Sequence, residues 1–162
     1  MIFLSLGTTK QPFMRAVDLM APFVEAGERV VVQYGCTEPD HSRVGIEWVK
    51  FMEHDELMDH ISEARAFFCH AGVGSVITSL MRDTMPIVIA REARFGEHVD
   101  DHQIDLATRL DGRGLVVVLP YGDADVEGAA KRASAAQATA QGRGQELYSR
   151  VREITRRRVS PG

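Results

Sequence analysis

The sequence has little cysteine, no long hydrophobic run and no large excess of charge of either sign. Its two cysteines, Cys36 and Cys69, do not form a CxxC pair, which excludes a disulfide-rich scaffold and is typical of a reducing compartment. No apolar run approaches the roughly 20 residues of a membrane-spanning helix. The formal net charge of −4 excludes the broad basic field with which many proteins bind nucleic acid.

The composition is that of a soluble globular protein. Hydrophobic residues make up 44% and charged residues 26% of the 162 residues, which are ordinary values for such a protein. Residues 1–10 carry no positive charge ahead of their apolar residues, so they are typical of a first strand and not of a secretion signal. We therefore expect one cytoplasmic domain that is large enough to bury its own core.

Short apolar runs alternate with amphipathic stretches along the chain. Strands are predicted at 2–6, 29–34, 47–51, 66–69, 86–90 and 115–119, and helices at 13–26, 55–64, 75–81 and 101–110. This alternation predicts an α/β fold, a Rossmann-like parallel sheet with helices on both faces, over residues 1–122. Residues 123–162 are predicted to form a helical extension of one or two helices, broken near Gly142 and Gly144, with a frayed end.

Two loops with glycines follow predicted strands, where the ligands of parallel sheets bind. Gly7 permits a tight turn after the first strand, and the hydroxyls of Thr8 and Thr9 can bond an anion. An ordinary strand–helix turn with a helix cap is an equal alternative. His70–Ser75 precedes a helix, and its glycines and the helix N-terminus favour a phosphate. This segment has neither the GK[ST] of a Walker loop nor the full GxGxxG fingerprint.

Residues 91–103 gather charged, imidazole and amide side chains after a buried strand. Asp101 and Gln103 carry groups that can accept hydrogen bonds from sugar hydroxyls or donate to them. His98 and His102 are four residues apart, which leaves a metal site on a helix as an alternative. Because no HExxH pattern and no obvious third ligand accompany them, structural or ligand-contacting roles without a metal are favoured.

Taken together, these segments resemble the glycosyltransferase family 28 C-terminal domain. The matching stretches occur in family order at 2–9, 12–13, 32–35, 69–75, 86–89, 91 and 95–103. Within the family, the chain is similar to the stand-alone small subunits of two-component transferases. These include the small subunit of a bacterial exopolysaccharide glucuronosyltransferase and the donor-binding subunit of the eukaryotic dolichol-pathway UDP-GlcNAc transferase.

The resemblance implies the C-terminal half of a GT-B glycosyltransferase, with three groups of donor-binding residues. The residues implied to bind the diphosphate are Gly7, Thr8, Thr9, Gly72, Val73, Gly74 and Ser75. Those implied to bind the base or ribose are Gln33, Gly35, Thr78 and Arg91. Those implied to bind the donor sugar are Phe95, Gly96, Glu97, His98, Asp101, His102 and Gln103. His70 is the catalytic candidate, although a buried hydrogen bond that holds its loop is the favoured alternative.

The same resemblance implies an inverting transfer from a UDP-sugar to a lipid-linked saccharide acceptor in polysaccharide or glycan synthesis. No metal or other cofactor is expected, because in GT-B enzymes a helix dipole and backbone N–H groups stabilise the leaving diphosphate. Thr78 and Ala90 stand where the family usually has Glu and Pro. A non-catalytic nucleotide-sugar sensor and a stand-alone UDP-sugar isomerase or hydrolase are the alternative functions.

The implied partner is a membrane-associated subunit that binds the acceptor and recruits this chain to the inner face of the membrane. The region from about residue 144 to 158 is expected to dock on that partner, and a homodimer is left open. The arginine cluster at 156–158 either contacts anionic lipid headgroups or favours the helix C-terminus electrostatically.

Overall fold

The computed structural model describes residues 1–156, so Arg157 and Arg158 of the arginine cluster lie outside the described residues. The strands are β1 (Ile2–Ser5), β2 (Val30–Gln33), β3 (Ile46–Val49), β4 (Ala66–Cys69), β5 (Ile87–Val88) and β6 (Val117–Val118). The helices are α1 (Met14–Asp18), α2 (Ala21–Glu25), α3 (His54–Glu63), α4 (Val73–Met81), the 3-10 turn η1 (Ala93–Phe95), α5 (His102–Asp111), α6 (Val126–Ala140) and α7 (Gly144–Arg156).

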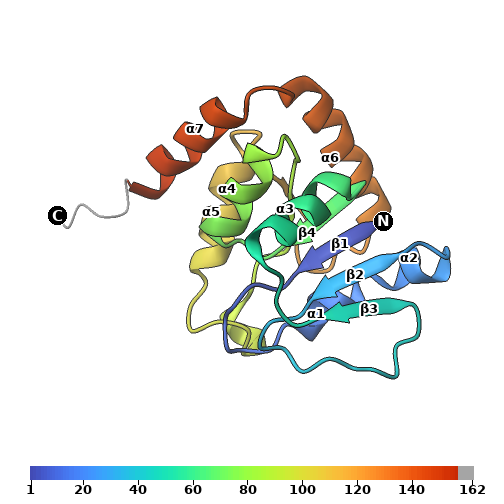
Figure 1. The fold of residues 1–162 in the computed structure, drawn as a ribbon. Helices are drawn as coiled ribbons and strands as arrows, with labels where there is room; N and C mark the ends of the chain where they lie inside the picture. Colours follow the sequence, from blue (N-terminus) through green and yellow to red (C-terminus); the bar gives the residue numbers. More distant parts are fainter. Residues whose placement is uncertain (157–162) are drawn as a thin grey trace.

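The six strands form one parallel sheet in the order β3-β2-β1-β4-β5-β6 (Figure 1). The predicted Rossmann-like α/β fold is confirmed. The chain builds outward from β1 in one direction and from β4 in the other, so the carboxyl ends of these two strands flank a crevice. Ser5 at the end of β1 pairs with Gln33 of β2 and with Cys69 of β4, which brings the loops after all three strands side by side.

Each face of the sheet packs against its own set of helices. Side chains alternate along a strand, so Ile2 and Leu4 of β1 belong to one hydrophobic cluster and Phe3 belongs to the other. The first cluster joins the sheet to α1, α2 and α6, and the second joins it to α3, α4, α5 and α7. The loops and the helix N-termini at the carboxyl edge of the sheet, between these two layers, are what a ligand would contact.

One predicted helix is wrong in its length. Residues 13–26 were expected to form a single helix, but α1 ends at Asp18 and α2 begins at Ala21 with Pro22 in its first turn. Proline has no N–H and its ring clashes with the carbonyl four residues earlier, so a continuous helix is broken there. The chain therefore turns between two short helices.

The C-terminal segment forms two helices, as predicted. Helix α6 packs on β4, β5 and β6, and α7 packs along α4 (Figure 1). A Cβ on Gly144 would lie 2.8 Å from the carbonyl oxygen of Leu80, so glycine permits the close approach of α7. The side chains of Leu147, Val151 and Ile154 are buried beneath α7. The domain division at residue 122 stays a prediction.

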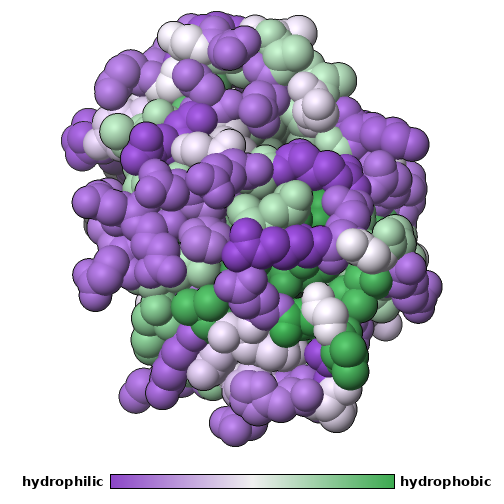
Figure 2. Space-filling view, turned by 45° about the vertical axis from the view of Figure 1, so that its right-hand side comes forward, coloured by the Kyte–Doolittle hydropathy of each residue, from purple (hydrophilic) through white to green (hydrophobic). Residues whose placement is uncertain are grey.

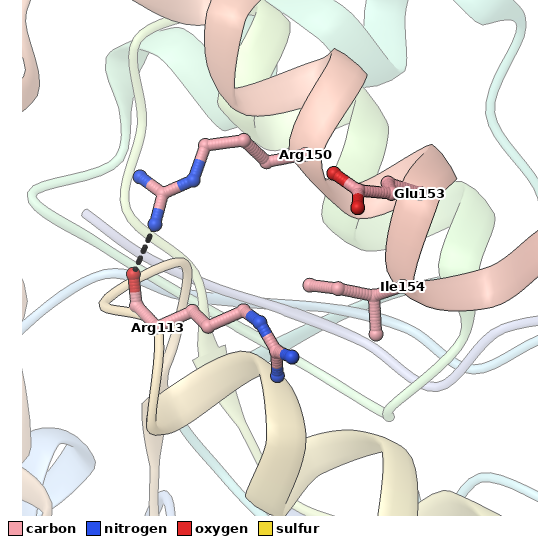
Figure 3. A pocket seen from close by; sticks show the side chains of 4 residues that line it. All are labelled: Arg113, Arg150, Glu153 and Ile154. Atoms are coloured by element: carbon pink, nitrogen blue, oxygen red, sulfur yellow. Dashed lines mark hydrogen bonds between the residues drawn. The ribbon is translucent and has the colours of Figure 1, made fainter. Parts of the chain in front are cut away.

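A small cavity lies between α7 and the end of α5. Arg113, Arg150, Glu153 and Ile154 line its volume of about 130 Å³ (Figure 3). The Arg150 guanidinium donates to the carbonyl oxygen of Arg113 over 3.1 Å. Elsewhere, the face in Figure 2 is mostly hydrophilic, and hydrophobic side chains gather in its lower half. Within residues 1–156, no helix has the length and apolar character needed to cross a bilayer.

Candidate functional site

Gly7 and Gly35 bring the loops after β1 and β2 into close contact at the crevice. Both have a left-handed backbone, with φ of +74° and +58°, which side chains other than glycine rarely adopt. A Cβ on Gly35 would also lie 2.2 Å from the carbonyl oxygen of Gly7. Glycine is therefore required at position 35 for conformational and for steric reasons.

The His70 imidazole occupies a slot between the loops that follow β1 and β4. A Cβ on Gly7 would lie 2.3 Å from its Nε2 atom, and a Cβ on Gly72 would lie 2.1 Å from its Cε1 atom. The ring contacts two polar side chains: Gln103 Nε2 is 3.3 Å from its Nδ1 atom, and Ser75 Oγ is 3.5 Å from its Nε2 atom. Two glycines thus make room for one imidazole.

His70 is neutral near pH 7. Burial, and after it the nearby charge of Arg91, lowers the pKa of its imidazole to about 4. Desolvation disfavours the charged form of a histidine, and a neighbouring cation disfavours it again. The ring therefore carries one proton that it can donate and one lone pair that can accept.

Helix α4 begins without a side-chain cap beside this imidazole. Its N-cap residue is Gly72, and within residues 1–156 no side-chain cap accepts a hydrogen bond from the first turn. The nine-residue helix directs backbone donors and the positive end of its dipole toward the crevice. Val73 and Ser75 are half-buried in this turn, and a Cβ on Gly74 would meet nothing within 4 Å. Phosphates and other anions bind in proteins at helix N-termini of this kind, so the predicted diphosphate contact is chemically possible here.

Two residues near β2 extend the crevice. Gln33 is 7% exposed, and its Oε1 atom has no hydrogen-bond partner within the described residues. An unpaired buried oxygen is a group that a ligand or a water molecule would satisfy. Phe51, which the sequence reasoning missed, is 49% exposed and its Cε1 atom lies 3.6 Å from the Cβ position of Gly35. The available signal was an aromatic residue at the end of the strand predicted over 47–51, which in the structure already ends at Val49.

The other predicted residues of this part of the site are less constrained. Thr8 is exposed and Thr9 is half-buried, both directly after Gly7. Thr78 is half-buried on α4, three residues after Ser75 and therefore on the same side of the helix. The structure thus brings the predicted diphosphate residues to the crevice from the loops after β1 and β4, with Thr78 on the same side as Ser75.

Arg91, in contrast, is fully buried. Its guanidinium donates to the carbonyl oxygens of Leu6, Gln11 and Glu97 over 2.7 to 3.0 Å. Burial lowers the pKa of this guanidinium to about 10. Arg91 therefore ties the loop after β1 to the loop after β5, and its guanidinium is not on the surface of the crevice. The predicted contact with the base or ribose stays a prediction.

Glu97 also points into the protein. It is 4% exposed, receives a hydrogen bond from Arg15 of α1 over 2.7 Å and receives another from the backbone N–H of Glu92 over 3.0 Å. Arg15 also donates to the carbonyl oxygen of Ala90. The sequence reasoning missed Arg15, and the only available signal was a cation next to the buried Ala16 in a predicted helix.

Phe95 lies on the surface near the ends of β5 and β6. Its ring centroid is 4.8 Å from that of Tyr121, and the Arg94 guanidinium stacks over both rings at 4.7 and 4.4 Å. Gly96 ends η1 with a φ of +68°, and Asp101 accepts a hydrogen bond from the backbone N–H of Ala93 over 2.8 Å. A cavity of about 270 Å³ lies beside Arg94 and Tyr121.

His98 and His102 share one carboxylate. The Nδ1 atom of His98 lies 3.1 Å from Asp100 and the Nε2 atom of His102 lies 3.4 Å from it. The backbone N–H of His102, together with these imidazoles, holds the pKa of Asp100 below its usual range. Because α5 begins at His102, His98 is not on the helix. Within residues 1–156, no three His, Cys, Asp or Glu side chains are grouped so that they could hold a metal ion.

The Gln103 side chain connects the loop after β4 with the loop after β5. It is 8% exposed, and its Oε1 atom accepts from the backbone N–H groups of Ala71 and Arg91 over 3.2 Å each. Its Nε2 atom contacts His70. The carboxamide is thus bound to the loops after β4 and β5, and its contact with a donor sugar stays a prediction.

Residues 1–119 match the glycosyltransferase family 28 C-terminal domain. The chain belongs to this family. A sequence comparison of this chain with curated proteins found no match. The segments HAGVGS at 70–75 and FGEHVDDHQ at 95–103 lie within the matched residues and belong to the site described above.

Solved glycosyltransferases have the same fold. The calicheamicin glycosyltransferase CalG4 aligns at 17% identity and a TM-score of 0.68, covering 99% of this chain and 43% of that chain. MurG from Acinetobacter baumannii aligns at 17% identity and a TM-score of 0.54, and the alignment covers 94% of this chain and 49% of MurG. The solution structure of ALG13 aligns at 15% identity and a TM-score of 0.50, and the alignment covers 86% of this chain and 84% of ALG13.

These likenesses show the fold of the C-terminal half of a GT-B glycosyltransferase. The chain spans about two fifths of the length of the first solved structures that it matches. The family and the fold together support a role in sugar transfer.

Proposed function

We propose that this family 28 domain binds the UDP-sugar donor of an inverting glycosyltransferase whose acceptor is held by a partner subunit. The observation that carries the proposal is the uncapped start of α4 beside the neutral His70, in the crevice between β1 and β4. The donor diphosphate would lie against residues 72–75, with the loop at 7–9 on its other side.

The proposed chemistry is a displacement at C1 of the donor sugar. An acceptor hydroxyl forms the new bond to C1 while the bond from C1 to the diphosphate oxygen breaks, and negative charge grows on the diphosphate. Backbone N–H groups and the dipole of α4 would stabilise that charge. The acceptor proton passes to a general base, which we assign to no residue of this chain. No step of this scheme requires a metal ion.

The base and ribose would lie over the ends of β2 and β3. Gln33 supplies an unpaired carboxamide oxygen, Phe51 supplies an exposed ring next to Gly35, and Thr78 supplies a hydroxyl on α4. An aromatic face can stack on a nucleobase. A donor bound in this way would place its sugar toward residues 95–103.

A separate subunit would supply the acceptor site. The support for this is the structural likeness to ALG13, of which the alignment covers 84%. We propose a membrane-associated partner that presents a lipid-linked saccharide. Because Leu147, Val151 and Ile154 of α7 are already buried in this domain, a partner would dock on the outer face of α7.

Titration calorimetry with UDP and GDP tests the donor site. Gly74→Ala adds one methyl group in open space at the start of α4, so we expect a folded protein that binds UDP at least about tenfold more weakly than the wild type. The matched control is Gly112→Ala, at the end of α5 with a right-handed backbone, which should bind UDP normally. Equal affinity in both variants, or no binding of UDP to the wild type, would contradict the proposal.

A transfer assay tests the catalytic part. The purified chain would be supplied with a UDP-sugar, a lipid-linked saccharide and membranes that contain the partner. We expect sugar transfer that depends on both proteins and falls in Gly74→Ala. Release of UDP by the chain alone would instead support a hydrolase, and donor binding without transfer in the complete system would support a sensor.

A further inference from the structure

The orientation of the Gln103 carboxamide is determined by two backbone donors. The N–H groups of Ala71 and Arg91 both point at the same atom of the side chain, over 3.2 Å each. An N–H group needs an acceptor, and the NH₂ of a carboxamide has none to offer. That atom must therefore be Oε1, because the flipped carboxamide would set an NH₂ group against two N–H groups.

This orientation determines which nitrogen of His70 carries the proton. With Oε1 occupied, the atom 3.3 Å from His70 Nδ1 is the NH₂ group of Gln103, which can only donate. Nδ1 must accept and is unprotonated. In a neutral imidazole the proton then resides on Nε2.

We infer that Gln103 is a positioning residue that holds His70 as the Nε2–H tautomer and directs this proton into the crevice at the start of α4. The role as a donor to the diphosphate rests on the proposed function, whereas the tautomer does not. The inference assigns Gln103 an action through His70 in addition to the sugar contact that the family resemblance implies.

Among residues 1–156, the Nε2 proton has only a weak hydrogen-bond partner. Ser75 Oγ is 3.5 Å away, at the outer limit of a hydrogen bond, so a phosphate oxygen would compete for the proton successfully. The charged and titratable groups that act on the ring are Arg91, from the loop after β5, and His98, from the loop before α5, and both oppose its protonation. The geometry thus favours a neutral donor over an imidazolium.

Nitrogen NMR of the full chain tests the tautomer directly. In the wild type at pH 7, His70 should show a protonated Nε2 and an unprotonated Nδ1, with scalar coupling across the hydrogen bond from Gln103 Nε2 to His70 Nδ1. A protonated Nδ1, or an imidazolium, would overturn the inference without any variant being made.

Gln103→Glu tests the causal role of the carboxamide. The carboxylate has nearly the same shape but only accepts, so at pH 8 it should draw the proton of His70 to Nδ1. The lone pair of Nε2 would then face the diphosphate, and UDP should bind about tenfold more weakly at this pH. Thr108→Glu, an exposed position on α5, is the control for added negative charge and should change neither readout.

The outcomes separate the two claims. If Gln103→Glu keeps the Nε2–H tautomer, Gln103 does not position the proton and the inference is wrong. If the tautomer changes but UDP affinity equals that of the wild type, the link between the tautomer and the diphosphate is wrong. If the wild type has the expected tautomer and binds no UDP, the tautomer assignment is supported and the proposed function fails.

Discussion

Two regions on the carboxyl edge of the sheet use their polar groups differently. The first region is the pair of loops at 7–9 and 70–75, and the second is the loop at 91–103. The first region leaves the start of α4 uncapped and the Nε2 proton of His70 with a distant partner. In the second region, Arg91 and Glu97 are buried and hydrogen-bonded within the protein. The first region has hydrogen-bond donors available for a ligand. The second region connects the loops that carry those donors and so fixes their positions.

This difference shows that a charged residue in a matched motif can connect loops inside the protein. Charged residues are rarely buried unless they are paired, and the Arg15–Glu97 pair and the Arg91 contacts follow this rule. Their effect on a donor would be indirect, because they connect the loops after β1 and β5. Substitutions in the two regions should therefore separate stability from binding.

The largest expected effect is on stability, from Arg91→Met. The substitution leaves three backbone carbonyls without their charged donor, so the free energy of unfolding should fall by about 3 to 5 kcal/mol. Urea denaturation measures this loss. Arg94→Met, at an exposed guanidinium three residues after Arg91 in the same loop, should lose less than about 1 kcal/mol. Similar losses in both variants would remove the distinction between the regions.

The next effect is the pH dependence that His70 contributes. Its pKa is about 4 in the folded protein against 6.5 for the ordinary group, so the unfolded chain takes up this proton first as the pH falls. The stability contribution is complete above pH 6.5 and is lost progressively down to pH 4, by up to about 3 kcal/mol. Urea denaturation at several pH values should show a shallower pH dependence for His70→Asn. Parallel curves would contradict the buried neutral ring.

A smaller effect should distinguish two glycines within HAGVGS. Gly72→Ala places a methyl group against His70 and should destabilise the fold by about 1 to 3 kcal/mol. Gly74→Ala has free space and lies inside α4, so its stability should stay equal or rise by up to about 1 kcal/mol. Thermal unfolding of both variants checks this order. A Gly74→Ala protein that unfolds as easily as Gly72→Ala would show that the start of α4 is not open.

Much of the fold was predictable because the apolar strands are short and separated by regular helical patterns. The glycine loops were also predictable, since HAGVGS and its place after a strand are local features. The roles of three charged residues could not be predicted, namely Arg91, Glu97 and Arg15. Their hydrogen-bond partners lie far away along the chain, as in the Arg15–Glu97 pair. The break between α1 and α2 could have been foreseen from Pro22.

The smallest expected effect concerns Thr78, where the family usually has Glu. If the ribose lies beside this position, Thr78→Glu should strengthen UDP binding by about fivefold, since one additional hydrogen bond contributes about 1 kcal/mol. Calorimetry with UDP measures the change, and Thr78→Gln serves as the uncharged comparison. Weaker binding by Thr78→Glu than by Thr78→Gln would place the ribose elsewhere.

Mapping of UDP on the labelled protein by backbone amide chemical shifts tests the central claim most directly. The account predicts that the largest shifts occur at Gly7 and at residues 72–75, with smaller shifts along residues 91–103 because the latter respond through His70 and Gln103. Shifts confined to another part of the chain, or none at saturating UDP, would contradict it.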